Sequence, residues 1–195
     1  MPTTVRAAVV REVNGPILVE ALELKPPGRG ELTVKLAACG VCHSDLSAAN
    51  GTIAMALPLV LGHEGAGVVT EVGEGVTEFA VGDHVLSSFV AMCGRCRWCH
   101  SGRPALCDQP VLRALAAPGA TPRFRDARGE GLNVFSACGV MAEAATLAVD
   151  NVVRIDPAMP LDKACLVSCG VMTGVGAALN TAQVQAGSIL SLIHI

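Results

Sequence analysis

The sequence predicts a mainly β protein with some helix, organised around a small, partly closed β-barrel. Short apolar or alternating runs recur between turn residues over the first 155 positions, in a chain of 195 residues with 21 glycines and 11 prolines. Hydrophobic residues make up 51% of the chain and charged residues 16%, which supplies a packed core and argues against disorder. From residue 156 onward the pattern becomes helical.

Six runs are expected to form the strands of the barrel. Asn14-Gly15 separates the first two runs and Pro26-Pro27-Gly28 precedes the third, and both are typical turn sequences. Each run alternates or is continuously apolar over a length typical of a strand. The predicted strands are Val5–Val10, Ile17–Ala21, Leu32–Ala38, Gly67–Val72, Asp83–Phe89 and Met141–Val149.

The segment Arg113–Phe135 shows no clean period and is expected to be a loop. Its arginines lie in a stretch broken by proline and glycine, which predicts a solvated cluster. The chain has 14 Lys and Arg against 17 Asp and Glu, a net charge of −3, which argues against nucleic acid as a partner. The arginines of the segment are Arg113, Arg123, Arg125 and Arg128.

Residues 156–195 are expected to be the start of a second domain. Two prolines are followed by two helical stretches, Leu161–Ser168 and Met172–Gln183, which break at Cys169-Gly170. No charged residue occurs after Lys163, whereas the free face of a surface helix normally carries charges. We therefore expect this segment to pack against a part that the 195 residues do not contain.

The mean hydropathy of +0.51 raises the question of a membrane segment. No unbroken apolar run of about 18 residues occurs, and the first residues carry a charge inside their apolar stretch. Neither a spanning helix nor a signal peptide is predicted, and we expect a cytoplasmic protein without membrane contact. In that compartment most of the nine cysteines would serve something other than disulfides.

The strongest local signal is the spacing C-x2-C-x2-C-x7-C, formed by Cys93, Cys96, Cys99 and Cys107. Four thiolates so close in sequence can complete a tetrahedral sulfur shell, which zinc favours in structural sites. Four buried structural cysteines or an iron–sulfur cluster are the alternatives. Zinc is favoured over a cluster because the x7 step ends in no Cys-Pro.

A second constellation is dispersed along the chain and consists of Cys42, the His63-Glu64 pair and Cys169. Two thiolates and one imidazole would form a three-ligand zinc site with an open fourth position, as catalytic zinc requires. Sequence spacing alone cannot assemble this site. His63 could equally be a structural histidine, and Cys39 with Cys42 could be a redox CxxC pair, although no thioredoxin-like pattern surrounds them.

These segments resemble, in order, the zinc-dependent alcohol dehydrogenases of the medium-chain dehydrogenase/reductase family. The resemblance runs over residues 5–190, and the four clustered cysteines stand where the family has its structural-zinc lobe. It implies a GroES-like catalytic domain over residues 1–155, followed by the first helices of a truncated Rossmann-type domain over residues 156–195. The signature residues are Gly62-His63-Glu64, Gly67, Gly73 and Val76.

The resemblance also implies roles for residues of the second constellation. Cys42, His63 and Cys169 match the ligands of the catalytic zinc. Glu64 matches a nearby acid that can exchange as a ligand. Asp45 matches the carboxylate that orients the zinc-binding histidine, a role known to tune metal sites.

Other residues match positions that handle the substrate and cofactor. Ser44 matches the hydroxyl that takes the proton of the alcohol, and Phe89 matches a wall of the substrate pocket. His43 stands where the family contacts the cofactor pyrophosphate, and Thr173 matches a position that faces the nicotinamide. The cysteines without a family role, expected to be buried packing residues, are Cys39, Cys138 and Cys165.

The implied activity is hydride transfer between a primary or secondary alcohol, or an aldehyde adduct, and NAD or NADP. Two zinc ions are expected per chain, one catalytic and one structural, and the full-length enzyme is expected to be a homodimer or homotetramer. The segments resemble bacterial members of the class III and formaldehyde-dehydrogenase-like branch. A second hypothesis is a non-catalytic zinc-binding module that uses the GroES-like barrel for interactions.

The chain departs from the family pattern in two places. Ser47 stands where some members carry a histidine at the outer end of the proton path, so protons would leave through water or another group. Gly187-Ser188-Ile189-Leu190 is expected to open the first nucleotide-binding strand, but no G-x-G-x-x-G follows, so the fragment itself is expected to be inactive. Residues 190–195 coincide with a translated transposon-end sequencing adaptor and are expected to be non-native.

Overall fold

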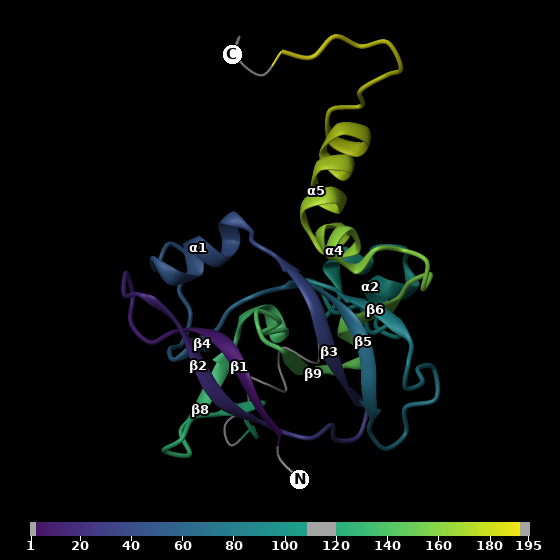
Figure 1. The fold of residues 1–195 in the computed structure, drawn as a ribbon. Coiled ribbons are helices and arrows are strands. Elements are labelled where there is room, and N and C mark those ends of the chain that lie inside the picture. Colours follow the sequence, from purple (N-terminus) through teal and green to yellow (C-terminus); the bar gives the residue numbers. More distant parts are fainter. Residues whose placement is uncertain (1–2, 109–119, 192–195) are drawn as a thin grey trace.

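The computed structural model describes residues 3–108 and 120–191, and the described strands form two sheets (Figure 1). The strands of the first sheet are β1 (Thr3–Val10), β2 (Ile17–Leu24), β4 (Leu59–Val60), β7 (Phe124–Arg125) and β8 (Gly131–Val134). They close into a small barrel in the order β1-β2-β7-β8-β4, because β4 pairs with β1 as well as with β8. The β4–β8 pair is parallel and the other barrel pairs are antiparallel.

The second sheet is open and antiparallel, in the order β10-β6-β5-β3-β9. Its strands are β3 (Glu31–Gly40), β5 (Glu64–Val72), β6 (His84–Ser87), β9 (Ala144–Ala148) and β10 (Val152–Arg154). The β3–β5 register ends with Gly40 opposite Glu64. The end of β3 therefore lies beside the His63-Glu64 pair.

One apolar core joins the barrel to the sheet. Alternation along β1 buries Val5, Ala7 and Val9 while Thr4 and Arg6 are exposed, as expected for a strand with one face in the core. The other strands supply the remaining members of the same cluster. These include Leu22, Leu24, Leu32, Val34, Val69, Val85, Phe124 and Leu147.

Short helices lie at the end of the two sheets where β3 ends (Figure 1). They are α1 (His43–Ala49), α2 (Arg97–His100), α4 (Leu161–Ala164) and α5 (Gly170–Gly176). Segments of 3₁₀ helix cover Pro104–Leu106, Phe135–Ala137, Val149–Asn151 and Cys165–Ser168, and a π-helical turn covers Ala177–Thr181. Ala164 and Cys165 are buried against Ala66 and Leu86, whereas α5 projects away from the sheets (Figure 1).

The predicted elements largely form. Each of the six predicted strands overlaps a strand of the structure, and both helical stretches of the C-terminal segment are helical, with the break at Cys169. The sequence prediction missed α1, α2 and the short strands β4 and β10. These elements are too short to carry a hydrophobic period of their own.

The prediction that Arg113–Phe135 is a loop is wrong for its second half. Strands β7 and β8 lie within it, joined by a tight turn in which the N–H of Gly129 donates to the carbonyl of Asp126, with Gly129 at φ +78°. The two residues of β7 are held by pairing with β2, so the tertiary partner rather than a local pattern makes the strand. Residues 109–119, which include Arg113, lie outside the described residues.

Arg123 is not part of a solvated cluster, because its side chain is almost fully buried. Nη1 donates to the carbonyl of Ala137 at 2.5 Å, and Nη2 lies 3.5 Å from Oε1 of Glu31. Burial lowers the pKa of Arg123, and the charge of Glu31 opposes that shift. Arg125 and Arg128 are exposed, as predicted.

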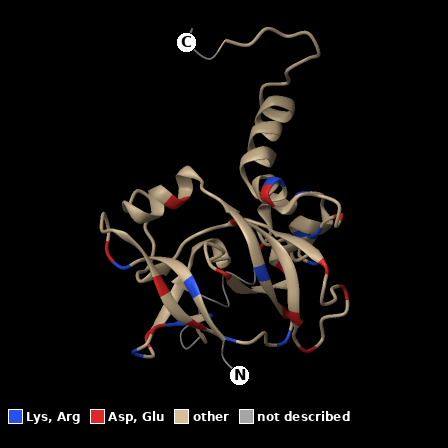
Figure 2. Cartoon of the chain, viewed as in Figure 1, with Lys and Arg blue, Asp and Glu red and all other residues tan. Residues whose placement is uncertain are grey.

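The C-terminal segment is largely uncovered. Val171, Met172, Val175 and Leu179 are exposed, and Figure 2 shows no charged residue on α5 or in the described residues that follow it. The predicted turn at Gly187 forms, but residues 188–190 are not assigned to a strand in the described part of the chain. A strand requires a neighbour for its backbone groups. Residues 192–195 lie outside the described residues, so the expectation for residues 190–195 is untested.

Among the described residues, no single helix has the length and apolar character needed to cross a membrane. Leu161–Ser168 and Gly170–Thr181, which meet at a bend of 51°, satisfy the length and composition criteria only when taken together.

Glu31 is expected to stabilise the fold by neutralising buried Arg123. Burial alone would raise the pKa of Glu31, but hydrogen bonds from Lys25 and the Gly28 N–H, with the Arg123 charge, outweigh it and lower the pKa. Glu31→Gln should therefore reduce the free energy of unfolding by about 2–4 kcal/mol, measured by urea denaturation at pH 7. Exposed Glu71 provides the control, since Glu71→Gln should change stability by less than about 0.5 kcal/mol.

The same pair has a defined pH dependence. Because the folded-state pKa of Glu31 is lowered, its contribution is complete above the ordinary glutamate pKa of about 4.3 and is lost as the pH falls further. The difference between wild type and Glu31→Gln should therefore shrink below that pH. A constant difference would contradict this account.

Candidate functional site

Cys93, Cys96, Cys99 and Cys107 converge into a four-cysteine cluster that could hold a metal ion. The Sγ–Sγ distances are 3.6 Å for Cys96–Cys99, 3.6 Å for Cys93–Cys107 and 3.9 Å for Cys96–Cys107. Zinc–sulfur bonds of about 2.3 Å in a regular tetrahedron would place sulfurs about 3.8 Å apart. The thiols are therefore already spaced for one tetrahedral ion.

The lobe also supplies donors to the sulfurs. The backbone N–H of Cys93 donates to Sγ of Cys107 at 3.4 Å. Backbone N–H groups of Asp108 and Cys99 lower the pKa of Cys96 to about 6, whereas desolvation raises the pKa of Cys99 to about 12. Of the four cysteines only Cys107 is buried, which argues against the alternative of four packing cysteines.

Cys42, His63, Glu64 and Cys169 form a second group, here called the mixed cluster. One ligand atom from each residue lies within 4.8 Å of all the others. The structure therefore brings together the four dispersed residues that the sequence singled out. Cys39 is not a member of this cluster, and all nine cysteines are free thiols.

The residues of the mixed cluster lie at three places where a helix or strand begins or is interrupted. Cys42 directly precedes α1, and His63 lies at the turn that enters β5. Cys169 interrupts the helical segment at φ −144°, ψ −66°, between the 3₁₀ segment Cys165–Ser168 and α5. Because Ala164 and Cys165 pack on the sheet, that break is held next to the start of β5.

Asp45 joins the pieces of this site. Its Oδ2 accepts a hydrogen bond from the N–H of Cys42 at 3.2 Å, and its Oδ1 accepts one from the N–H of Gly62 at 2.9 Å. Oδ2 also lies 3.4 Å from Nδ1 of His63, and Asp45 is only 3% exposed. One buried carboxylate thus links the start of α1, the turn before β5 and the imidazole.

His63 is fully buried between two aromatic rings. The ring of Phe89 lies 5.1 Å away and that of Phe135 lies 5.3 Å away, both edge-on, so the imidazole plane is fixed. Burial alone would lower the pKa of His63, but the Asp45 carboxylate outweighs it and raises the pKa. Among the described residues, neither ring nitrogen of His63 has a hydrogen-bond partner.

Ser87 and Phe135 are site residues that sequence reasoning missed. Oγ of Ser87 donates to the carbonyl of His63 at 2.7 Å and accepts from the N–H of Gly65 at 2.8 Å. This bridge fixes the backbone on both sides of Glu64. No local pattern marks either residue, since Ser87 reaches its partners through the β5–β6 pairing.

The mixed cluster brings acidic groups close together. Glu64 is 3% exposed, and its Oε1 lies 4.0 Å from Nε2 of His63. Desolvation raises the pKa of Cys169 to about 11, and the nearby Cys42 and Glu64 charges add to this shift. The backbone N–H of Ser44 instead lowers the pKa of Cys42.

The predicted proton-handling and cofactor residues surround Cys42 and Cys169. Ser44 Oγ lies 3.6 Å from Cys42 Sγ, and Thr173 Oγ1 lies 4.0 Å from Cys169 Sγ. His43 is exposed on α1, and its Nδ1 forms a 3.2 Å hydrogen bond with Oγ of Ser47. The position that departs from the family pattern is thus occupied by a buried hydroxyl bonded to His43.

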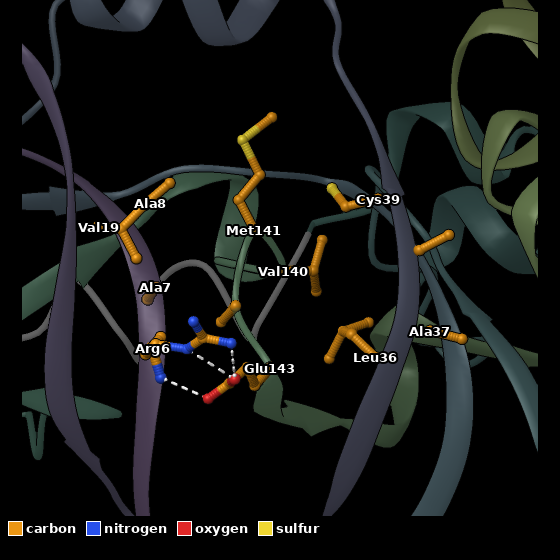
Figure 3. Close-up of a pocket in the computed structure, with 12 residues that line it drawn as sticks. Arg6, Ala7, Ala8, Val19, Leu36, Ala37, Cys39, Val140, Met141 and Glu143 are labelled. Carbon is orange, nitrogen blue, oxygen red and sulfur yellow. Dashed lines mark hydrogen bonds and ion pairs between the residues drawn. The ribbon is translucent and has the colours of Figure 1, made fainter.

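A separate pocket of about 460 Å³ opens between β1 and β3 (Figure 3). Its lining is mostly apolar, with Cys39 and Met141 at one end and the Arg6–Glu143 ion pair at the other. None of its lining residues belongs to the mixed cluster. Cys39 is therefore a pocket-lining residue, whereas Cys138 and Cys165 are buried as predicted.

The residues of the mixed cluster fit a zinc ion. Two thiolates and an imidazole are a common ligand set for zinc, and the Nε2 atom of His63, which faces Glu64, has no hydrogen-bond partner in the described part of the chain. A metal-ligating histidine commonly pairs its other nitrogen with a carboxylate, which Asp45 provides. A divalent cation would also offset the negative charge of the thiolates and the carboxylate that bind it.

Comparisons with known proteins place this geometry in a family. Residues 28–157 match the model of the alcohol dehydrogenase GroES-like domain family. The chain is 43% identical over 188 residues to alcohol dehydrogenase class-3 of Drosophila melanogaster and 41% identical over 191 residues to S-(hydroxymethyl)glutathione dehydrogenase of Saccharomyces cerevisiae. In each case the match covers 95% of this chain and 49% of the relative, so the chain spans about half the length of these curated relatives.

A solved structure shares this architecture. The alcohol dehydrogenase zinc-binding domain protein from Burkholderia ambifaria superposes with a TM-score of 0.86 at 35% identity. The match covers 95% of this chain and 50% of that structure's chain.

The contact between Asp45 and His63 should affect the zinc affinity of the mixed cluster. Asp45→Asn keeps the shape of the side chain but removes the charge beside His63, so zinc should bind the mixed cluster roughly 10–100-fold more weakly. Competition with a chromophoric chelator measures the zinc affinity of each site. Asp162→Asn, at an exposed carboxylate on α4, should leave both affinities unchanged. Equal zinc affinities for wild type and Asp45→Asn would show that the contact does not tune the site.

Proposed function

Because this chain belongs to the alcohol dehydrogenase GroES-like domain family, we propose that it is the metal-binding part of a zinc-dependent oxidoreductase that acts on alcohols with NAD or NADP. The observation that carries the proposal is the mixed cluster. It combines three zinc-type ligands with a fully buried imidazole whose Nδ1 lies 3.4 Å from Oδ2 of Asp45 and whose Nε2 has no hydrogen-bond partner among the described residues. A scaffold without catalysis has no need for such a three-ligand arrangement.

Cys42, His63 and Cys169 would hold the catalytic zinc and leave a fourth position open. Zinc bound there supplies Lewis acidity, which lowers the pKa of an alcohol hydroxyl. Asp45 keeps the imidazole oriented through Nδ1, so that Nε2 faces the ligand atoms. Glu64, within 4.8 Å of the other ligand atoms, is the additional oxygen donor at the site.

Ser44 would take the proton of the alcohol at its Oγ, since this hydroxyl lies 3.6 Å from the Cys42 sulfur. On the same helix, α1, His43 and Ser47 form a separate hydrogen bond. We assign His43 and Thr173 to the cofactor and Phe89 to the substrate pocket. Phe89 packs against His63 and thereby helps to exclude water from the apolar side of the imidazole.

Cys93, Cys96, Cys99 and Cys107 would hold a second zinc with no open position. A filled tetrahedral shell contributes folding energy and no reactivity. In this proposal the second zinc keeps the lobe after β6 folded.

The substrate proposal is a primary or secondary alcohol, or an aldehyde adduct. Two relatives are named alcohol dehydrogenase class-3 and S-(hydroxymethyl)glutathione dehydrogenase. The second name supports an adduct of an aldehyde with a thiol as the substrate. We propose a reducing, cytoplasmic location, because both clusters need free thiols. For the full-length enzyme we propose a homodimer or homotetramer.

Metal analysis tests the proposal against a non-catalytic module. The purified chain should contain two zinc ions, and His63→Ala should lose one of them while retaining the four-cysteine zinc. Elemental analysis after gel filtration gives the stoichiometry, with His100→Ala as a control on exposed α2. A single zinc that is insensitive to His63→Ala would favour the interaction module.

The 195-residue chain by itself should show no nicotinamide-dependent turnover. It contains no G-x-G-x-x-G segment, and the curated relatives are about twice as long. Absorbance at 340 nm, monitored with NAD or NADP and a series of alcohols, measures this directly. Reduction of either nucleotide above the rate of the His63→Ala variant would contradict the expectation.

A further inference from the structure

Gly40 and Glu64 face each other where β3 meets β5. A Cβ atom on Gly40 would lie 2.1 Å from Oε2 of Glu64, and 3.1 Å from both Glu64 Cβ and Leu166 Cδ2. The first distance is well inside any real contact. A side chain of any size at Gly40 would therefore occupy the space that the Glu64 carboxylate uses.

Backbone conformation does not require a glycine at position 40. Gly62, in the same site, has φ +96° and needs glycine for its conformation, but Gly40 is not among the glycines with positive φ. Close backbone packing does not explain it either. A Cβ on Gly67 would meet the carbonyl oxygen of Lys35 at 2.1 Å, whereas the closest atom at Gly40 is the tip of a flexible side chain.

The carboxylate of Glu64 is held in a slot between two glycines. On its other side, a Cβ on Gly170 would lie 3.8 Å from Oε1, an ordinary contact distance. Glu64 is buried, and its Oε1 lies 4.0 Å from Nε2 of His63. The slot therefore keeps a carboxylate beside the imidazole and the two thiols of the mixed cluster.

We propose that Gly40 is a positioning residue whose missing side chain keeps the Glu64 carboxylate beside Cys42, His63 and Cys169, where it strengthens metal binding. The effect on metal rests on the proposed function, because it requires zinc at the mixed cluster. The effect on the position of the Glu64 carboxylate does not rest on the proposed function. As a positioning residue, Gly40 acts through the Glu64 carboxylate.

The test compares Gly40→Ala, Glu64→Ala, the double variant and Gly170→Ala. Gly40→Ala should remain folded, because the obstructing atoms at its closest contact can rotate away. Its crystal structure should show the Glu64 carboxylate moved out of the slot with the β3–β5 pairing intact. Gly170→Ala, which meets the same carboxylate at an ordinary distance, should leave it in place.

Zinc affinity of the mixed cluster is the second readout. Gly40→Ala and Glu64→Ala should each weaken it by a similar factor, on the order of 10-fold, and the double variant should be no weaker than Glu64→Ala. Additive losses, or a carboxylate that stays in the slot of Gly40→Ala, would overturn the proposal. So would a displaced carboxylate with unchanged zinc affinity.

The proposed function and the inference about Gly40 can fail separately. If wild-type protein binds no zinc at the mixed cluster, the proposed function and the metal-binding part of this inference fail together. The crystal structure of Gly40→Ala then still decides whether Gly40 positions the carboxylate. If zinc binds and His63→Ala removes it, but Gly40→Ala behaves as wild type, only the inference about Gly40 fails.

Discussion

The buried carboxylate of Asp45 is the interaction on which the rest of the site depends. It accepts hydrogen bonds from the N–H groups of Cys42 and Gly62 and lies at ion-pair distance from His63. A buried carboxylate is costly unless its oxygens are satisfied, and here every partner belongs to a segment that carries or adjoins a candidate ligand. The contacts that satisfy the charge therefore also hold the ligands in register.

The second constraint on the site is the room available where its segments meet. The site lies where a strand end, a turn and a helix break meet, and glycines keep those segments close enough for their side chains to converge. Gly62 allows the turn before His63, and Gly40 leaves room for the Glu64 carboxylate. Packing of Cys165 on the sheet brings Cys169 to the same place from a distant part of the chain. The convergence is thus a property of the packed sheet.

Several features of the fold followed from local sequence. The six strand runs, the two helical stretches and the break at Cys169 could be read from hydrophobic period and turn residues, because these patterns act over a few neighbouring positions. Strands β7 and β8 could not, since their few residues are held by β2 and β4. The prediction that Arg123 is solvated is wrong for the same reason, because its burial depends on Glu31 and Ala137.

The sequence by itself determined the four-cysteine cluster, because its ligands are close along the chain and can meet without a distant element. It also determined the family, through motifs spread over most of the chain. Only the tertiary structure decided how Asp45, Ser87 and Phe135 support His63, and that Glu64 stands opposite Gly40. Those relations depend on strand register and packing between remote segments, which local spacing does not encode.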